Sequence, residues 1–473
     1  MTRRRRRAIL PVASSNGIKW FPYSWQLAVA TMHRHVSTRR LLDLSRHEDF
    51  KTLTEHTGQS PFRASALLLA VALLVLGNGL QATVVGIRGG MEGMAEETIG
   101  LIMSAYFVGF VAGSLYIPGL IQKVGHIRTF AALASIASAA ALGLVIFVGP
   151  VSWLSLRIVT GACVAGMVIV TESWLNAGTT RDQRGRVLAT YGVVFYAAWA
   201  GSQALLNMAS ADGFLLFALV SILFSLALVP ITLTRAGVPG VVEADRANLK
   251  QLYAISPLGL VGAFVLGVSV GAFWGMGPTF GQQIGFSDTQ ISVFLMLALV
   301  GALILQWPLG WTSDRIDRRL IIVGSCCVAA ACSAAMAVAW DESKGLLFAL
   351  AMLLGAFAMP VYSLCVAHVN DQIETGEVVA AASGLILVYG LGSVAGPFCA
   401  SLLMGQVGPS GLFVFLAGAF GLFSLYGLWR LWLSEALGQG KKDSYVSVPQ
   451  TSHAVLPLHK HSPEQTYGRR APR

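Results

Sequence analysis

Long apolar runs constrain this chain more than any other feature of its sequence. Between residues 61 and 433, polar breaks separate twelve apolar segments, each at least 22 residues long. A helix needs roughly 20 predominantly apolar residues to cross a bilayer, whereas barrel strands alternate apolar and polar residues over about ten. The sequence therefore predicts an all-α integral membrane protein with twelve transmembrane helices. The predicted spans are 63–87, 97–120, 128–149, 151–176, 186–209, 212–234, 256–280, 289–311, 319–340, 344–369, 377–404 and 408–433.

The net charge of +10 would suggest a nucleic-acid partner in a soluble protein. Here the excess lies in the two ends of the chain, because residues 1–60 carry seven surplus basic residues and residues 434–473 carry three. Residues 61–433 are neutral overall. Only 12% of the chain is charged and 55% is hydrophobic, against about 25% and about 45–50% in soluble domains. Soluble, fibrous and disordered classes are excluded, and no nucleic-acid partner is expected.

The longest polar break in the hydrophobic body runs from Arg235 to Lys250 and divides the predicted spans six and six. We expect the polar ends of the chain to be disordered, since they lack the apolar residues that form a core. The expected parts are a basic N-terminal extension (1–60), a six-helix half (61–234), a linker (235–255), a second six-helix half (256–433) and a C-terminal tail (434–473).

Basic residues in the short loops predict the orientation of the chain, because loops rich in Lys and Arg stay in the cytoplasm. Eleven of these residues fall on one side of the predicted membrane, and only Arg88 and Lys344 fall on the other. This bias places both termini, the linker and the basic loops in the cytoplasm of a bacterial cell, with the helices in its inner membrane.

A short repeat relates the two halves. Residues 118–128 and 310–320 align without gaps, 192 residues apart, at equivalent places in each half. Two pseudo-symmetric halves joined by a cytoplasmic linker are typical of secondary transporters, which bind their solute near the midplane between the halves.

The second copy of the repeat, Gly310-x-x-x-Asp314-Arg315-x-x-Arg318-Arg319, resembles the signature cytoplasmic loop of the Major Facilitator Superfamily. The first copy departs from that pattern, with Gln122 in place of Asp and His126 in place of Arg, although it keeps Arg128. The resemblance implies a loop that sets the balance of inward and outward states. Its residues would be Gln122, Arg128, Asp314, Arg315 and Arg318.

Three further stretches are similar to a bacterial branch of this superfamily, the YcaD-like proteins. They are Val124-Gly-His-Ile-Arg128, Thr171-Glu-Ser-Trp-Leu-Asn176 and Gly271-Ala-Phe-Trp274-Gly. Arg157-x-x-x-Gly161 is similar to a second superfamily motif, whose Arg is associated with proton transfer. The resemblance implies a transporter of a small organic solute that works by alternating access and is coupled to protons.

Two ionisable residues lie within one predicted span. A charge at membrane depth costs at least about 2.5–3.5 kcal/mol, so it needs a partner or a function. Arg157 and Glu172 are about 22 Å apart along the helix and roughly 60° apart around it. Arg157 is predicted to clamp a substrate anion or relay a proton, unless it bonds a backbone carbonyl. Glu172 is predicted to carry the coupled proton, unless it bonds Arg181 or Arg184 of the next loop.

The other cavity candidates are polar or aromatic residues on two equivalent helices. Asn78, Gln81 and Arg88 lie within about 80° of one another on the first span. They indicate a cavity-lining stripe, with interhelical hydrogen bonds as the alternative and an interfacial anchor as another role for Arg88. Trp274 lies on the Gly- and Pro-interrupted seventh span, where it could stack on a solute or belong to an interfacial belt. Tyr362, just after Pro360, is a further candidate.

The sequence contains no Walker loop, catalytic triad or cluster of metal-ligating residues, so we expect neither an enzyme nor a bound metal or cofactor. The expected partners are a small solute, protons and the bilayer, for a protein that acts as a monomer. A membrane protein that kept the transporter fold as a sensor or assembly partner is the alternative, because the first-half loop has lost its Asp.

Overall fold

The computed structural model describes residues 61–177, 181–233, 248–373, 378–433 and 445 of the 473-residue chain. These residues all belong to one compact unit, Gln59–Arg473. The predicted N-terminal extension, residues 235–247 of the linker and the C-terminal tail apart from Tyr445 lie outside the described part.

Every element of the described chain is a helix. The first half contains α3 (Pro61–Met91), α4 (Glu96–Val124), α5 (His126–Ile146), α6 (Pro150–Ala177), α7 (Arg181–Leu205), the 3-10 turn η2 (Leu206–Met208) and α8 (Leu215–Leu233). The second half contains α9 (Leu249–Ile255), α10 (Pro257–Gln283), α11 (Asp288–Arg315), α12 (Arg318–Val338), α13 (Lys344–Ala358), α14 (Val361–Asn370), α15 (Val378–Val407) and α16 (Gly411–Leu433).

Eleven helical segments of the described chain are long and apolar enough to cross a membrane, which confirms the predicted all-α membrane fold. Helices α13 and α14 count as one such segment, interrupted at Pro360, whose ring cannot donate the backbone hydrogen bond that a continuous helix requires. Helix α7 occupies the place of the predicted fifth span. It is uncharged from Val187 to Leu205 but is more polar than the others, because it carries Tyr, Trp, Ser and Gln residues.

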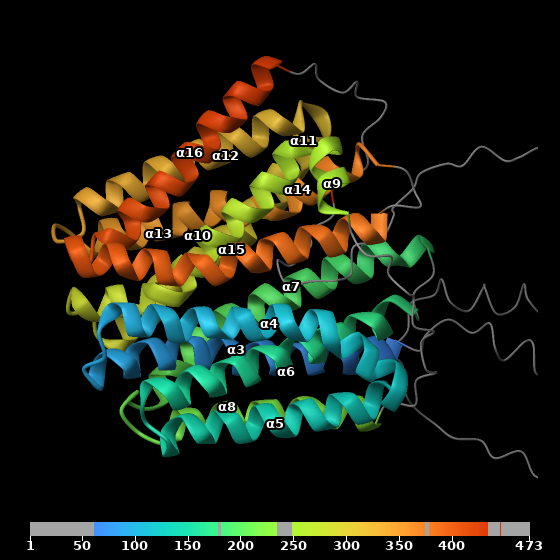
Figure 1. Cartoon of the computed structure of the whole chain (residues 1–473), viewed down its shortest axis with the longest axis vertical. Helices are drawn as coiled ribbons and strands as arrows, with labels where there is room; N and C mark the ends of the chain where they lie inside the picture. The colour runs from blue at the N-terminus through green and yellow to red at the C-terminus, as the bar shows by residue number, and fades with distance from the viewer. Residues whose placement is uncertain (1–60, 178–180, 234–247, 374–377, 434–444, 446–473) are drawn as a thin grey trace, which may run out of the picture. The chain divides into compact units, whose positions relative to one another are not determined.

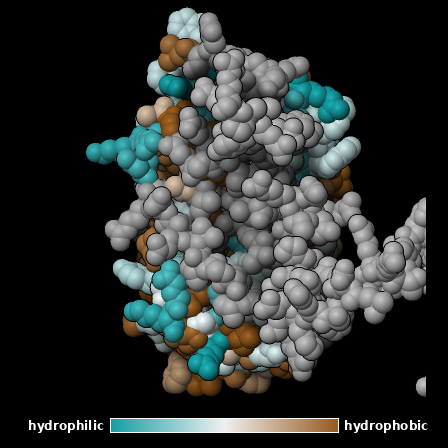
Figure 2. Space-filling view, turned by 90° about the vertical axis from the view of Figure 1, so that its right-hand side faces the viewer, coloured by the Kyte–Doolittle hydropathy of each residue, from teal (hydrophilic) through white to brown (hydrophobic). Residues whose placement is uncertain are grey.

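The long helices run alternately in opposite directions, so their connections gather at two ends of the bundle (Figure 1). We call one the Glu92 end; it holds the connections 92–95, 147–149, 209–214, 284–287, 339–343 and 408–410. The opposite Gly125 end holds Gly125 and the connection 316–317. Figure 2 views the Gly125 end, where hydrophilic side chains lie on parts of the rim and hydrophobic ones on the flanks, as expected for a membrane protein.

The two halves pack directly against each other. Helix α3 contacts α10, α4 contacts α15 and α7 contacts α11 (Figure 1). At the Glu92 end, the Gln283 side chain donates a hydrogen bond of 2.7 Å to Glu96, and Asn207 donates one of 3.1 Å to the Ser292 hydroxyl. Ser292 in turn donates to the Gln203 carbonyl at 2.6 Å. Polar contacts between the halves therefore hold the Glu92 end together.

Glycines allow α4 and α6 to approach each other closely. A Cβ atom on Gly161 would lie 1.9 Å from the Tyr106 carbonyl oxygen, and one on Gly109 would lie 1.9 Å from the Ile158 carbonyl oxygen. Backbone atoms cannot rotate away as a flexible side chain can, so only glycine fits at these positions. Small residues are the usual means by which membrane helices come this close.

We expect Gly161→Ala to destabilise the protein by about 1–3 kcal/mol, because the added methyl group overpacks the α4–α6 contact. The measurement is the apparent Tm of the purified protein in detergent. Gly324→Ala is the matched control, since a Cβ on Gly324 meets no atom within 4 Å. Equal Tm values for the two variants would contradict the packing of α4 against α6.

Candidate functional site

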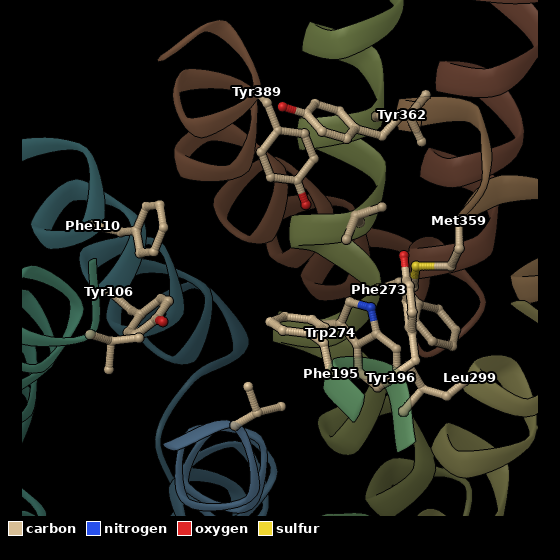
Figure 3. Packing of buried hydrophobic residues seen from close by; sticks show 14 of the residues in the cluster. Tyr106, Phe110, Phe195, Tyr196, Phe273, Trp274, Leu299, Met359, Tyr362 and Tyr389 are labelled. Carbon is tan, nitrogen blue, oxygen red and sulfur yellow. The ribbon is translucent and has the colours of Figure 1, made fainter. Parts of the chain in front are cut away.

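A cavity lies between the two halves, lined by α3, α4, α6 and α7 on one side and by α10 and α15 on the other. It holds about 910 Å³ of space not filled by protein atoms, part of it continuous with solvent. Figure 3 shows Tyr106 and Phe110 of α4 across from Trp274 of α10 and Tyr389 of α15. The lining is mostly apolar and aromatic.

Arg157 of α6 is the only charged residue among those that line this cavity. Its side chain is buried, at 2% relative exposure, and its guanidinium carbon lies 4.6 Å from the centre of the Tyr106 ring. Nη2 lies 3.9 Å from the Met103 sulfur, while Nε and Nη1 have no hydrogen-bond partner among the described residues. Gly161, one turn further along, permits the close approach of Tyr106. The motif thus places a buried cation in contact with an aromatic face.

Aromatic residues of α7 and α10 form a further part of the lining. The Trp199 and Trp274 rings pack with centroids 4.5 Å apart, and the Phe195 ring meets Trp199 edge-on at 5.9 Å. Trp274 is buried in the interior of α10, with its indole nitrogen lacking a hydrogen-bond partner in the described chain. This position lies in the cavity rather than at the end of a span, where an interfacial belt would lie.

The polar residues predicted on the first span separate in the structure. Asn78 lines the cavity and lies within hydrogen-bonding reach of the Tyr106 hydroxyl. Gln81 is fully buried but is not a lining residue, and both its polar side-chain atoms lack hydrogen-bond partners within the described residues. Arg88, also outside the lining, donates a hydrogen bond of 2.6 Å to Glu92 at the end of the helix.

Tyr362 packs behind the cavity wall. Its side chain is fully buried on α14, and its ring meets the ring of the lining residue Tyr389 edge-on, with centroids 5.1 Å apart. It does not itself line the cavity. Tyr362 therefore supports a lining residue.

Glu172 lies on α6 toward the Gly125 end, separate from Arg157. Its carboxylate accepts a hydrogen bond of 2.7 Å from the Tyr191 hydroxyl of α7, and both residues are buried. The side chains of Arg181 and Arg184, the alternative partners considered from the sequence, lie outside what the structure describes. Tyr191 is a partner that sequence reasoning missed, because periodicity does not reveal which face of α7 meets α6.

The second copy of the loop repeat forms a buried ionic network at the Gly125 end. Arg318 Nη2 lies 2.8 Å from Asp314, and Nη1 lies 3.0 Å from Asp371, which follows α14. The side chains of Arg318 and Asp371 are 1% and 2% exposed. Arg315 instead lies over the Trp311 ring, 3.6 Å from its centre. The network joins the end of α11, the start of α12 and the end of α14.

Tyr445 is the one residue of segment 434–473 that the structure describes, and it contacts this network. Its backbone N–H donates to both carboxylate oxygens of Asp314, at 3.0 and 3.1 Å. Its ring lies against Gly310, where a Cβ would come within 2.1 Å of it. Burial raises the pKa of the Tyr445 phenol to about 12. Sequence reasoning missed this contact, since a single Tyr in a polar tail carries no periodic signal.

The first copy of the repeat has a different arrangement. Gln122 and Arg128 are exposed, and neither has a hydrogen bond or an ion pair within the described residues. His126 is buried and stacks on Trp174 of α6, with ring centroids 5.8 Å apart. An aromatic contact thus stands where the second half has a buried ion pair.

Comparison with known proteins agrees with this architecture. A family model described as the Major Facilitator Superfamily matches residues 259–446. The chain is also 29% identical, over 354 residues, to an uncharacterized MFS-type transporter, YcaD, of Escherichia coli strain K12 / DH10B; the alignment covers 74% of this chain and 91% of the relative. In sequence, the chain is therefore similar to transporters of the Major Facilitator Superfamily. Members of this superfamily are transporters rather than enzymes.

Further comparisons show the same similarity. The chain is 28% identical over 359 residues to an uncharacterized MFS-type transporter of Enterobacter sp. strain 638, covering 74% of this chain and 91% of that one. Its fold is similar to the nucleoside transporter NupG, with a TM-score of 0.65, 11% identity and coverage of 80% and 100%. Its fold is also similar to that of a bacterial homologue of the human lysosomal transporter Spinster, with a TM-score of 0.64 and 14% identity. That comparison covers 82% of this chain and 100% of the homologue. At these identities the two structures show the fold alone.

We expect Asp371→Asn to destabilise the protein by about 3–5 kcal/mol, because it leaves the buried Arg318 short of a carboxylate. The measurement is again the Tm in detergent. Asp341→Asn, in the exposed turn before α13, is the matched control and should leave the Tm unchanged. If Asp371→Asn were as stable as this control, the buried ion pair would be contradicted.

Proposed function

We propose that the protein is a proton-coupled secondary transporter that moves a small organic solute by alternating access. The observation that carries the proposal is the cavity between the two halves, whose lining includes the buried guanidinium of Arg157, which has no ion pair among the described residues. Retaining such a charge inside a membrane is costly unless it serves a ligand. We further propose that the Gly125 end faces the cytoplasm of a bacterial inner membrane, on the basis of the loop charges.

Alternating access requires that contacts closing one end of the cavity break when the other end closes. The Gln283–Glu96 and Asn207–Ser292 hydrogen bonds join the halves at the Glu92 end. All four residues carry polar groups that water can satisfy after separation, so opening this end exchanges protein hydrogen bonds for hydration at little net cost. These contacts support the proposal that the halves are closed together at the Glu92 end in this state.

Cross-linking the Glu92 end should stop transport. Glu96→Cys with Gln283→Cys, in a background with the exposed Cys327 and Cys399 replaced by Ser, is treated with a short bifunctional thiol reagent. Uptake of labelled organic acids, amino acids, sugars and nucleosides into proteoliposomes is then measured. We expect at least a tenfold loss of the flux of any solute that the untreated protein moves.

The matched control cross-links two residues of the same half. Lys344 Nζ lies 3.2 Å from Gln290 Oε1, joining α13 to α11 at the same end. Gln290→Cys with Lys344→Cys should keep its flux after cross-linking, because the halves stay free to move. Undiminished flux with the Glu96–Gln283 cross-link would contradict alternating access. Solute binding with no flux in any sample would favour the alternative role, a sensor that kept the fold.

Glu172 is our candidate for the coupled proton. Its carboxylate is 2% exposed and receives a hydrogen bond from Tyr191, which ties α6 to α7. Burying an ionised carboxylate is far more costly than burying a protonated one, so opening and closing of the site are linked to proton uptake and release. Its position toward the Gly125 end gives it access to water when that end is open.

Glu172→Gln should keep the hydrogen bond to Tyr191 while removing the titratable proton. We expect uptake driven by a pH gradient to fall at least tenfold, with solute exchange at equal pH retained. Proteoliposomes with and without an imposed gradient measure both. Tyr191→Phe is the companion variant, which removes the hydrogen bond but keeps the carboxyl and so should retain gradient-driven uptake. Unchanged gradient-driven uptake in Glu172→Gln would remove Glu172 from the coupling.

The network of Asp314, Arg318 and Asp371 is our candidate for the conformational latch at the Gly125 end. The side chains of Arg318 and Asp371 in this network are buried. The network joins the ends of three helices, and these ends would have to move relative to the first half during alternating access. The carboxylate of Asp314 also accepts the backbone N–H of Tyr445. A charge network with discrete bonded arrangements is a suitable element for setting the balance between two states.

A further inference from the structure

We propose that the cavity binds an aromatic monoanion, a small molecule with one aromatic ring system and a single carboxylate, and that Arg157 holds the carboxylate. This inference deepens the proposed function, on which it rests for the transport step. The binding step stands on the lining residues alone.

The charge of the ligand follows from Arg157. This residue forms no ion pair within the described chain, and its described contacts are a thioether and an aromatic face. Two guanidinium nitrogens, Nε and Nη1, lack hydrogen-bond partners there although they are buried. The guanidinium edge offers parallel N–H groups that match the two oxygens of a carboxylate. An acid group therefore supplies what the protein leaves unsatisfied.

The number of charges is limited to one. No Asp or Glu is among the described residues that line the cavity, so a cationic solute would find no counter-charge in this lining and would be repelled by Arg157. A dianion would leave its second charge in an apolar environment, which is costly. A neutral solute would leave the guanidinium as it is now. Only a monoanion neutralises the site.

Aromatic side chains determine the shape of the remainder of the ligand. They come from both halves and line the cavity together with Arg157. Figure 3 shows five of them, Tyr106, Phe110, Phe195, Trp274 and Tyr389. Aromatic rings pack favourably against one another in offset and edge-on arrangements, so a planar ring fits between these walls. The residues concerned are Tyr106, Phe110, Phe195, Trp199, Trp274 and Tyr389.

Few polar groups remain for a ligand rich in hydroxyl groups. The single hydroxyl proton of Thr83 is already engaged, because the oxygen lies 2.9 Å from Gln203 Oε1 and 3.2 Å from the Gly79 carbonyl oxygen, both of which are acceptors. Asn78 Oδ1 is a buried acceptor without a partner in the described residues, so it can accept one N–H or O–H of a ring substituent. A sugar or polyol would lose more hydrogen bonds to water than this lining returns.

Arg157 acts in this scheme as a fixed charge. A guanidinium keeps its proton in proteins, so it binds an anion without itself exchanging a proton. The proton-carrying role stays with Glu172, which lies 15 residues further along α6. The two functions are thus separated on one helix.

The test measures binding by isothermal titration calorimetry with the purified full-length protein. The probes are benzoate and indole-3-carboxylate, their neutral amides, benzylamine, phthalate and cyclohexanecarboxylate. We expect the two aromatic acids to bind at least tenfold more tightly than the amides, the amine and the dianion. We also expect them to bind more tightly than cyclohexanecarboxylate, which has the charge but not the ring.

Arg157→Gln should reduce the affinity for benzoate at least tenfold and abolish the preference for acid over amide. Arg157→Lys should retain part of that preference, since lysine keeps the positive charge but lacks the parallel N–H groups of the guanidinium. Arg430→Gln, on α16 outside the cavity, is the matched control. Because Arg157→Gln could fail to fold, the selectivity of the unmodified protein decides the matter by itself. Equal binding of acids and amides, or no binding of the acids, overturns the inference.

Uptake of the same probes into proteoliposomes separates this inference from the proposed function. Selective binding of aromatic acids without flux supports the ligand class and contradicts transport. Flux of a neutral or cationic solute by a protein with no affinity for the acids supports transport and overturns the ligand class. Uptake of benzoate or indole-3-carboxylate that Arg157→Gln abolishes supports both.

Discussion

The hydrocarbon core of a bilayer offers no hydrogen-bond partner to a polar group, and the structure follows from that constraint. Backbone N–H and C=O groups form their hydrogen bonds within the helices. The charged side chains that stabilise the two ends of the helical body form ion pairs with one another. Arg88 pairs with Glu92 near one end of the bundle, and Arg318 pairs with Asp314 and Asp371 near the other. Arg157 differs from them, because it is buried without an acidic partner in the described chain.

The two halves have the same architecture but different chemistry at the Gly125 end. In the second half, a buried arginine joins two aspartates, and Tyr445 caps one of them. In the first half, His126 stacks on Trp174, while Gln122 and Arg128 are exposed. Among the described residues, the buried ion pairs of the Gly125 end therefore lie in the second half. Where the first copy of the repeat departs from the family pattern, at Gln122 and His126, it lacks the ion pair that the second copy forms.

The fold could be predicted from the sequence, because a helix that crosses the bilayer must stay apolar over a length that can be counted in residues. The sequence also identified Arg157, Asn78 and Trp274, since polar and aromatic residues stand out on apolar helices. It could not separate Gln81 and Arg88 from the cavity lining, because a helical wheel gives direction but not depth or the position of neighbouring helices. The Glu172–Tyr191 bond and the Tyr445 contact were missed because they join elements whose relative placement only the folded chain determines.

We propose that the two halves move about the cavity, opening one end as they close the other. Spin labels on Val151 of α6 and Val338 of α12 report on it directly, since both residues are exposed, at 78%, at the Glu92 end of opposite halves. Distances between the labels are measured by electron–electron double resonance in nanodiscs, with and without benzoate and at two pH values. We expect a second, longer distance between the labels, whose population changes with ligand and with pH. A single distance, unchanged under all conditions, would contradict it.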